Sequence, residues 1–182
     1  MSDSRIKKLA SPVGDLFVVA DRRGVLLCEF DTDGRCERQL ESFGVSPAES
    51  DDAVVDQVRD ELAEYFKGDR REFTVPLAPL GTPFQQAVWR QLLAIPFGQT
   101  RTYGQQAVAV GNRLAIRAVA RANGSNCRGI LIPCHRVIGS NGSLTGFGGG
   151  LPRKQWLLDH ERAVAGEGGL FAAPLQGANA SG

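Results

Sequence analysis

The feature that most constrains the fold of this chain is a change in charge and in apolar pattern at residues 78–83, "APLGTP". Residues 1–80 hold 11 Lys or Arg against 17 Asp or Glu, whereas residues 81–162 hold 10 against 2. The apolar pattern also changes there, from strand-like runs to helical spacing. A turn-rich segment where charge and periodicity both switch predicts a domain boundary. We therefore expect one domain at residues 1–80, a second at residues 81–165, and a flexible Gly/Ala-rich tail at residues 166–182.

The N-terminal part is expected to be a small antiparallel sheet covered by a helix. Residues 15–30, "DLFVVADRRGVLLCEF", place two apolar runs around an Asp-Arg-Arg-Gly turn, which is a hairpin signal. Residues 71–77, "REFTVPL", supply a candidate third strand. Between them, residues 52–66 repeat apolar side chains at helical spacing, with charges on the opposite face.

The C-terminal half is expected to begin with three helices. Residues 83–95 and 103–110 each follow a threonine that can cap a helix. A Gly-Asn turn then leads to a third helix at residues 114–122, which carries Arg117 and Arg121. Two short helices joined by such a turn are typical of a helix-turn-helix, although helical hairpins with surface arginines also occur outside DNA-binding proteins.

Residues 129–133, "GILIP", predict a buried strand. An Asn-Gly turn followed by residues 144–147 predicts a hairpin, or wing, and residues 152–161 predict a final helix that starts with proline. The expected fold class is therefore α+β. A small N-terminal antiparallel sheet with a helix precedes a mainly helical, winged helix-turn-helix domain.

The charge distribution favours a polyanionic partner. No carboxylate occurs between Thr82 and Leu158, and nine basic side chains lie in that span. Such a segment suits nucleic acid, and a basic surface kept for solubility is the alternative.

The chain has four cysteines, Cys28, Cys36, Cys127 and Cys134, without CxxC spacing, and only two histidines. Its N-terminal segment has no apolar stretch of signal-peptide length, and its apolar runs fall short of the roughly 20 residues of a membrane span. We therefore expect a cytoplasmic protein with free thiols, no membrane association, no metal and no cofactor.

Cys134 lies between a proline and a histidine in "ILIPCHRVIG", residues 130–139. A reactive thiol needs a nearby base or positive field, which His135 and Arg136 can supply. A cysteine protease fits poorly because its histidine is distant in sequence from the cysteine. A small buried residue that ends a core strand is the plain alternative.

The sequence resembles the O6-alkylguanine-DNA alkyltransferase family, the methylated-DNA--protein-cysteine methyltransferases. "IPCHRVIG" is similar to the active-site motif of that family, and "GTPFQQAVWRQLLAIPFGQTRTYGQQA", "RAVARANGSN" and "LTGFGGGLPRKQWLLDHE" extend the resemblance over residues 81–161. The resemblance implies a ribonuclease H-like N-terminal domain. It also implies a protein that flips O6-alkylguanine, and O4-alkylthymine, out of duplex DNA and transfers the alkyl group irreversibly to Cys134, in a single turnover.

The resemblance also implies catalytic roles. Cys134 would accept the alkyl group, His135 would draw off the thiol proton through a water molecule, and Glu161 would orient the imidazole. Asn126 would hold the recognition helix to the cysteine segment. Tyr103 would donate its hydroxyl to a guanine ring nitrogen.

For DNA, the resemblance implies that Arg117 fills the space left by the flipped base, and that the small Ala115 and Ala118 let the helix enter the minor groove. Arg121 adds charge to the same helix. Ile116 departs from relatives that have alanine there.

The main chain and the pocket wall supply the remaining implied contacts. The carbonyls of Cys134 and Val137 would accept from the exocyclic amine of guanine, and the amide of Gly148 would face the reacting oxygen. Phe147 would form a pocket wall where many relatives have tyrosine.

Two other functions remain open: a lesion sensor that binds damaged DNA without repairing it, and a transcriptional regulator. The acceptor cysteine separates this chain from the related sensors, which lack it. We expect the protein to be monomeric in solution and able to cluster on DNA.

Overall fold

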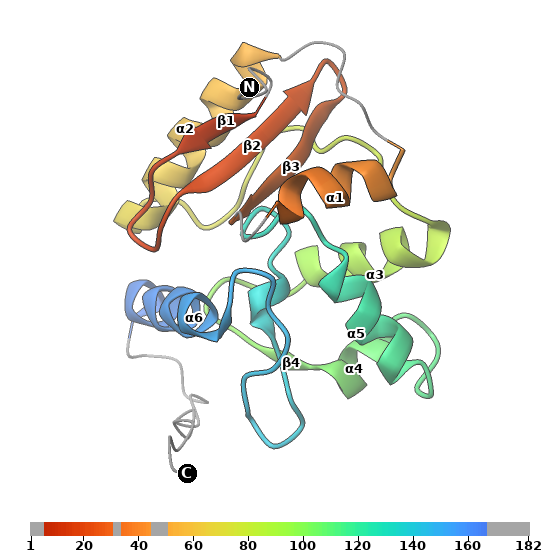
Figure 1. Ribbon diagram of the computed structural model, residues 1–182. Helices are drawn as coiled ribbons and strands as arrows, with labels where there is room; N and C mark the ends of the chain where they lie inside the picture. Colours follow the sequence, from red (N-terminus) through yellow and green to blue (C-terminus); the bar gives the residue numbers. More distant parts are fainter. Residues whose placement is uncertain (1–5, 31–33, 45–50, 167–182) are drawn as a thin grey trace.

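The computed structural model describes residues 6–30, 34–44 and 51–166. Its N-terminal part is a three-stranded antiparallel sheet in the order β1 (Lys7–Leu9), β2 (Leu16–Asp21) and β3 (Gly24–Phe30). Helix α2 (Asp52–Lys67) packs against β2 and β3, and the short helix α1 (Arg35–Ser42) packs against β3 (Figure 1).

The β2–β3 hairpin forms where the sequence predicts it. Asp21 pairs with Gly24 at the turn, and the Asp21 carboxylate accepts the amide of Arg23 at 2.8 Å. Gly24 has a φ of 122°, which residues with a side chain rarely adopt. All seven residues of β3 are buried, because the sheet contributes both to a core with α2 and to a core with the C-terminal helices.

The strand predicted at residues 71–77 is wrong, and β1 takes its place in the sheet. Pro76 has no amide hydrogen, which prevents a regular ladder. The amides of Thr74 and Val75 donate to the carboxylate of Glu61 instead of to a strand. A single isolated bridge joins this segment to β3.

Helix α2 confirms the amphipathic pattern of residues 52–66. Asp51 caps it by accepting two amides of its first turn, and Gly68 ends it in the left-handed conformation. Helix α1 was not predicted. Its N-cap is Gly34, which has no side chain that could accept a hydrogen bond from the first turn. The sequence therefore lacks the usual signal for a helix start.

Three helices make up most of the C-terminal half: α3 (Pro83–Leu93), α4 (Tyr103–Ala109) and α5 (Ile116–Gly124). Thr82 and Thr102 each form a capping box with a glutamine three residues later, which confirms the predicted starts of α3 and α4. Helix α5 begins at Ile116, two residues after the predicted start at Leu114. The amides of Leu114 and Ala115 donate to Asn112 instead, which forms a turn before the helix.

The segment at residues 129–133 is buried as predicted, but it is not a strand. It runs in turns, and Ile130 has a φ of 68°, in a left-handed region that a strand does not contain. It leads into a short 3-10 helix, η1 (Cys134–Arg136), and then into β5 (Val137–Ile138). Strand β5 pairs in parallel with β4 (Arg101–Thr102).

Residues 139–150 form a loop, so the return strand predicted at residues 144–147 is wrong. The amide of Gly139 donates to the carbonyl of Ser143 at 2.9 Å, which closes a turn. Helix α6 (Leu151–Ala165) confirms the final helix and extends beyond the predicted span at both ends.

The small antiparallel sheet and the mainly helical second half confirm the predicted α+β class (Figure 1). The tail predicted to be flexible lies outside the described residues from residue 167 onward. No helix within the described ranges is long and apolar enough to cross a membrane.

Candidate active site

Cys134 opens η1 directly after the buried segment. Its amide donates to the carbonyl of Ile132 at 2.8 Å, so the cysteine is held in a closed turn. All four cysteines of the chain are among the described residues, and three of them are buried whereas Cys134 is partly exposed. Cys134 is therefore the least buried of the four cysteine residues.

His135 and Glu161 form a buried pair next to Cys134. Nε2 of His135 lies 2.7 Å from Oε1 of Glu161, and both side chains are fully buried. Nε of Arg136 donates to Oε2 of Glu161 at 2.9 Å, and Nη2 donates to Oε1 at 3.0 Å. Burial raises the pKa of Glu161, but His135 and Arg136 outweigh it and hold that pKa well below its ordinary value of 4.5. Glu161 is therefore ionised at neutral pH.

The ring of His135 can act as a base through Nδ1. Because the Glu161 carboxylate only accepts hydrogen bonds, Nε2 carries the ring hydrogen. Nδ1 is buried and has no hydrogen-bond partner among the described residues. Burial lowers the pKa of His135 below its ordinary value of 6.5, although Glu161 acts in the opposite direction. The imidazole is thus neutral at pH 7, with its lone pair on Nδ1.

The thiol of Cys134 is held in its protonated form. Burial and, to a smaller extent, the nearby Glu29 raise its pKa to about 11, although Asn126 and Lys154 act in the opposite direction. A thiol with this pKa is mostly protonated at neutral pH, so its reaction requires removal of the proton by a base.

Asn126 links the end of α5 to the segment before the cysteine. Its Nδ2 donates to the carbonyl of Ile132 at 3.0 Å, and its Oδ1 accepts the amide of Arg128 at 3.0 Å. The residue is buried. One side chain therefore fixes both arms of the turn that leads to Cys134.

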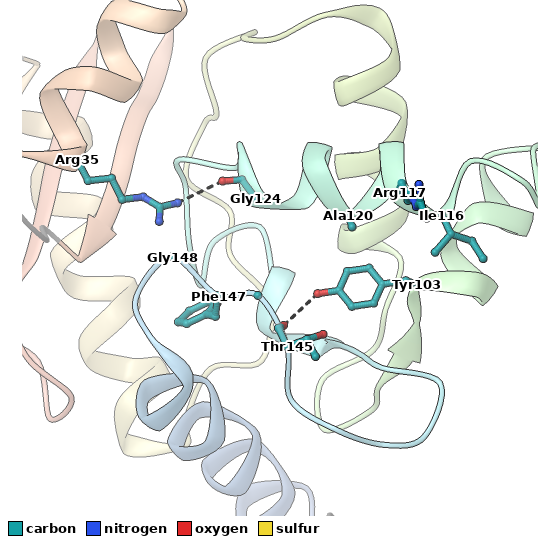
Figure 2. A pocket seen from close by; sticks show the side chains of 10 residues that line it. Arg35, Tyr103, Ile116, Arg117, Ala120, Gly124, Thr145, Phe147 and Gly148 are labelled. Carbon is teal, nitrogen blue, oxygen red and sulfur yellow. Dashed lines mark hydrogen bonds between the residues drawn. The ribbon is translucent and has the colours of Figure 1, made fainter. Parts of the chain in front are cut away.

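A cavity of about 510 Å³ opens between α1, α4, α5 and the loop at residues 139–150. Figure 2 shows Tyr103 reaching toward Thr145, whose carbonyl accepts the phenol hydroxyl at 3.1 Å. It also shows Arg35 of α1 reaching toward Gly124, whose carbonyl accepts from Nη2 at 3.2 Å. A cavity of this size falls within the range of small-molecule sites.

Four of the sequence-predicted residues line this cavity: Tyr103, Arg117, Phe147 and Gly148. Gly148 lies so close to the guanidinium of Arg35 that an added β-carbon would clash with it. The position therefore requires glycine unless Arg35 moves.

The other predicted DNA-binding residues lie outside the cavity lining. Arg121 is exposed on α5, and Ala115 and Ala118 are partly exposed on or just before the same helix. Cys134 is not among the lining residues either. Val137 is buried.

Lys154 is a site residue that the sequence reasoning missed. It is fully buried in α6, and its Nζ donates to the carbonyls of Val137 at 2.6 Å and Thr145 at 2.8 Å. Burial lowers its pKa to about 8, while the nearby Cys134 acts in the opposite direction. Lysine is usually a surface residue, so the sequence gives no indication that Lys154 is buried.

Arg35 was also missed, because the helix that carries it was not predicted. It enters the cavity from the N-terminal part of the chain and lies 3.9 Å from the buried carboxylate of Glu29. Among the described residues, no group of His, Cys, Asp and Glu side chains is arranged to hold a metal ion.

Two family models match the two halves of this chain. A family model described as "6-O-methylguanine DNA methyltransferase, DNA binding domain" matches residues 83–163. A second, described as "6-O-methylguanine DNA methyltransferase, ribonuclease-like domain", matches residues 5–79.

Individual proteins that carry the family's name are also similar to this chain in sequence. The "Methylated-DNA--protein-cysteine methyltransferase" of Shigella flexneri is 41% identical over 161 residues, which cover 85% of this chain and 94% of the relative. The protein of the same name from Mycobacterium bovis is 53% identical over 106 residues, which cover 58% of this chain and 64% of the relative. The crystal structure of Mycobacterium tuberculosis OGT in complex with DNA has a TM-score of 0.75 at 38% identity, and the match covers 87% of this chain and 93% of that chain.

A partly exposed cysteine lies beside a buried histidine and carboxylate in the basic half of the chain, and the family model that matches this half is that of a DNA-binding methyltransferase domain. The family models and the relatives identify the family. The chain belongs to the methylated-DNA--protein-cysteine methyltransferase family, which confirms the family predicted from the sequence.

Proposed function

We propose that this chain is a direct-reversal DNA repair protein that transfers an alkyl group from O6 of guanine, or O4 of thymine, to Cys134. The observation that supports the proposal most is the position of Cys134. It is the partly exposed residue among the four cysteines, and it adjoins the His135–Glu161 pair, in which Nε2 lies 2.7 Å from Oε1. No metal or cofactor takes part in the proposed reaction.

In the proposed reaction, the thiol proton of Cys134 passes through a water molecule to Nδ1 of His135, and Glu161 stabilises the imidazolium. The sulfur then forms a bond to the alkyl carbon while the bond from that carbon to O6 breaks. The electron pair leaves with the guanine, which is protonated as it departs, and Tyr103 donates its hydroxyl to a ring nitrogen. The thioether product is stable, so each molecule reacts once.

Access to the damaged base requires its rotation out of the duplex, because the reacting oxygen lies within the base stack. In our proposal α5 enters the minor groove through Ala115 and Ala118, and Arg117 occupies the space that the base leaves. Arg121 is exposed on the same helix and would contact phosphate.

The flipped base would occupy the cavity beside Tyr103, with Phe147 as a wall and the amide of Gly148 toward O6. The carbonyls of Cys134 and Val137 would accept from its exocyclic amine. The Val137 carbonyl already accepts from Lys154, and a carbonyl oxygen has a second lone pair for the base.

The organisation of the protein is part of the proposal. Residues 1–80 would form one domain and residues 81–165 the DNA-binding and acceptor domain. The protein would act in the cytoplasm as a monomer that can cluster on duplex DNA, where it has access to the chromosome.

Intact-protein mass spectrometry after mixing with duplex DNA that contains O6-methylguanine tests the function. We expect a gain of about 14 Da, one methyl group replacing one hydrogen, at Cys134. The adduct should be absent in Cys134→Ser and present in Cys127→Ser, because Cys127 is buried. Tight binding of the damaged duplex without an adduct would reject repair and favour the lesion-sensor alternative. Sequence-specific binding that ignores the lesion would favour a regulator.

A further inference from the structure

The carboxylate of Glu161 has more hydrogen-bond donors than its pairing with His135 requires. Oε1 accepts from Nε2 of His135 at 2.7 Å, from the hydroxyl of Tyr65 at 2.9 Å and from Nη2 of Arg136 at 3.0 Å. Oε2 accepts from the amide of Gly98 at 3.1 Å and from Nε of Arg136 at 2.9 Å. A carboxylate offers about four lone-pair positions, so these five donors leave none of them free and fix the orientation of the carboxylate.

Tyr65 belongs to α2, in the N-terminal part of the chain, whereas Cys134 and Glu161 lie in the C-terminal half (Figure 1). Its side chain is fully buried. Its ring packs edge-on against Phe97 at a centroid separation of 6.0 Å, and its carbonyl oxygen lies 2.8 Å from Nε2 of His160. Two successive residues of α6 are therefore tied to this one tyrosine.

The Tyr65 hydroxyl can only be the donor in its contact with Glu161, because an ionised carboxylate has no hydrogen to give. Burial raises the pKa of Tyr65 well above its ordinary value of 10, and Glu161 adds to this effect, so the phenol keeps its proton. Tyr65, His135 and Arg136 thus all donate to the same oxygen atom, Oε1 of Glu161.

We infer that Tyr65 is a positioning residue for alkyl transfer, which sets how strongly Glu161 attracts a proton onto the imidazole of His135. The inference rests on the proposed function and deepens it. With part of its charge engaged by the phenol, Glu161 stabilises an imidazolium less, and His135 stays neutral to a lower pH. The N-terminal domain would then contribute to the chemistry as well as to the scaffold.

The other charged groups that face His135 are Arg136 and Lys154, and both are cations that oppose its protonation. Neither contacts the Tyr65 hydroxyl through a hydrogen bond in the described part of the chain. A change at Tyr65 should therefore act on His135 through Glu161.

Tyr65→Phe removes the hydroxyl and keeps the ring. We expect the pKa of His135, followed by NMR of its ring protons in the unreacted protein, to rise by about half to one unit. The acid limb of the pH–rate profile for methyl transfer to Cys134 should move to higher pH by a similar amount. Tyr65→3-fluorotyrosine makes the phenol a stronger donor, so both quantities should move the opposite way. This second variant preserves the test if Tyr65→Phe does not fold.

Phe73→Leu is the matched control, because Phe73 packs on the Tyr65 ring at a centroid separation of 5.5 Å and leaves the hydroxyl in place. It should lower the melting temperature without moving either the His135 titration or the pH profile. The inference is overturned if Tyr65→Phe lowers the melting temperature and leaves both at their wild-type values. If the wild-type protein forms no adduct, the proposed function fails, and the NMR titration still decides whether Tyr65 controls the imidazole.

Discussion

Nζ of Lys154 donates to the main-chain carbonyl of Val137 at 2.6 Å, which ties helix α6 to strand β5, the strand that follows Cys134. The same nitrogen donates to the carbonyl of Thr145 at 2.8 Å, in the loop at residues 139–150. One buried ammonium group therefore holds together two backbone segments, and the second of them lines the cavity at Thr145.

We predict that Lys154→Met destabilises the protein and slows alkyl transfer. The variant leaves two carbonyl groups in the interior without their donor, which should lower the free energy of unfolding by about 2–4 kcal/mol. The loop that carries Phe147 should also loosen. Urea denaturation and the rate of adduct formation measure the two effects. Lys67→Met, at an exposed lysine, is the control and should change stability by less than about 0.5 kcal/mol. A stability of Lys154→Met equal to that of the control would show that these contacts do not stabilise the fold.

Arg117→Ala should impair reaction with duplex DNA more than reaction with free O6-methylguanine base. Arg117 lines the cavity, and extrusion of a paired base costs a few kcal/mol that the free base does not incur. We expect the rate constant for duplex to fall roughly ten-fold or more, with little change for the free base. Arg121→Ala is the matched control, because Arg121 is exposed on the same helix and does not line the cavity. It should weaken DNA binding in a salt-dependent manner. Equal losses on both substrates in Arg117→Ala would exclude a role in extrusion.

Glu29→Gln should make Cys134 more reactive toward iodoacetamide above pH 7. Burial raises the pKa of Glu29 to about 7, and its negative charge raises the pKa of Cys134. Removing the charge should lower the thiol pKa and speed alkylation roughly three- to ten-fold at pH 8. Below about pH 6 the wild-type carboxyl is protonated, so the two proteins should react alike.

Peptide mapping after alkylation would locate the label, and Glu37→Gln controls for loss of a carboxylate on the surface of α1, where Glu37 is exposed. An unchanged rate in Glu29→Gln at pH 8 would mean that Glu29 does not act on the thiol.

Those parts of the fold with strong local signals were predictable from the sequence. Helices α3 and α4 begin at threonine caps, and the β2–β3 hairpin surrounds a turn ending in Gly24. The segment at residues 129–133 was misread because apolar composition indicates burial and does not distinguish a strand from buried turns. Only the left-handed φ of Ile130 shows that a strand cannot form there.

The candidate site was predictable only where the residues resemble a family motif. That resemblance indicated Cys134, His135 and Glu161, and the structure shows the last two in contact. The contact from Tyr65 joins residues 96 positions apart, and no local periodicity or capping signal reports on such a distance. Lys154 was missed for a related reason, since its burial depends on loop 139–150 folding over α6.

The contribution of His135 to stability should decrease at acid pH. The pKa of His135 is lower in the folded protein than its ordinary value of 6.5. The neutral ring therefore contributes stability that is fully present above pH 6.5 and is lost as the pH falls through the lower folded pKa. The raised pKa of Glu29 acts in the opposite direction between its ordinary value of 4.5 and about 7. The pH dependence of the wild-type unfolding free energy alone would therefore combine the two effects.

We predict that the difference in unfolding free energy between wild type and His135→Gln is constant from pH 7 to 8 and shrinks below about pH 6.5. Urea denaturation at intervals of half a pH unit measures it, and a difference that stays constant down to pH 4.5 would contradict a lowered pKa for His135.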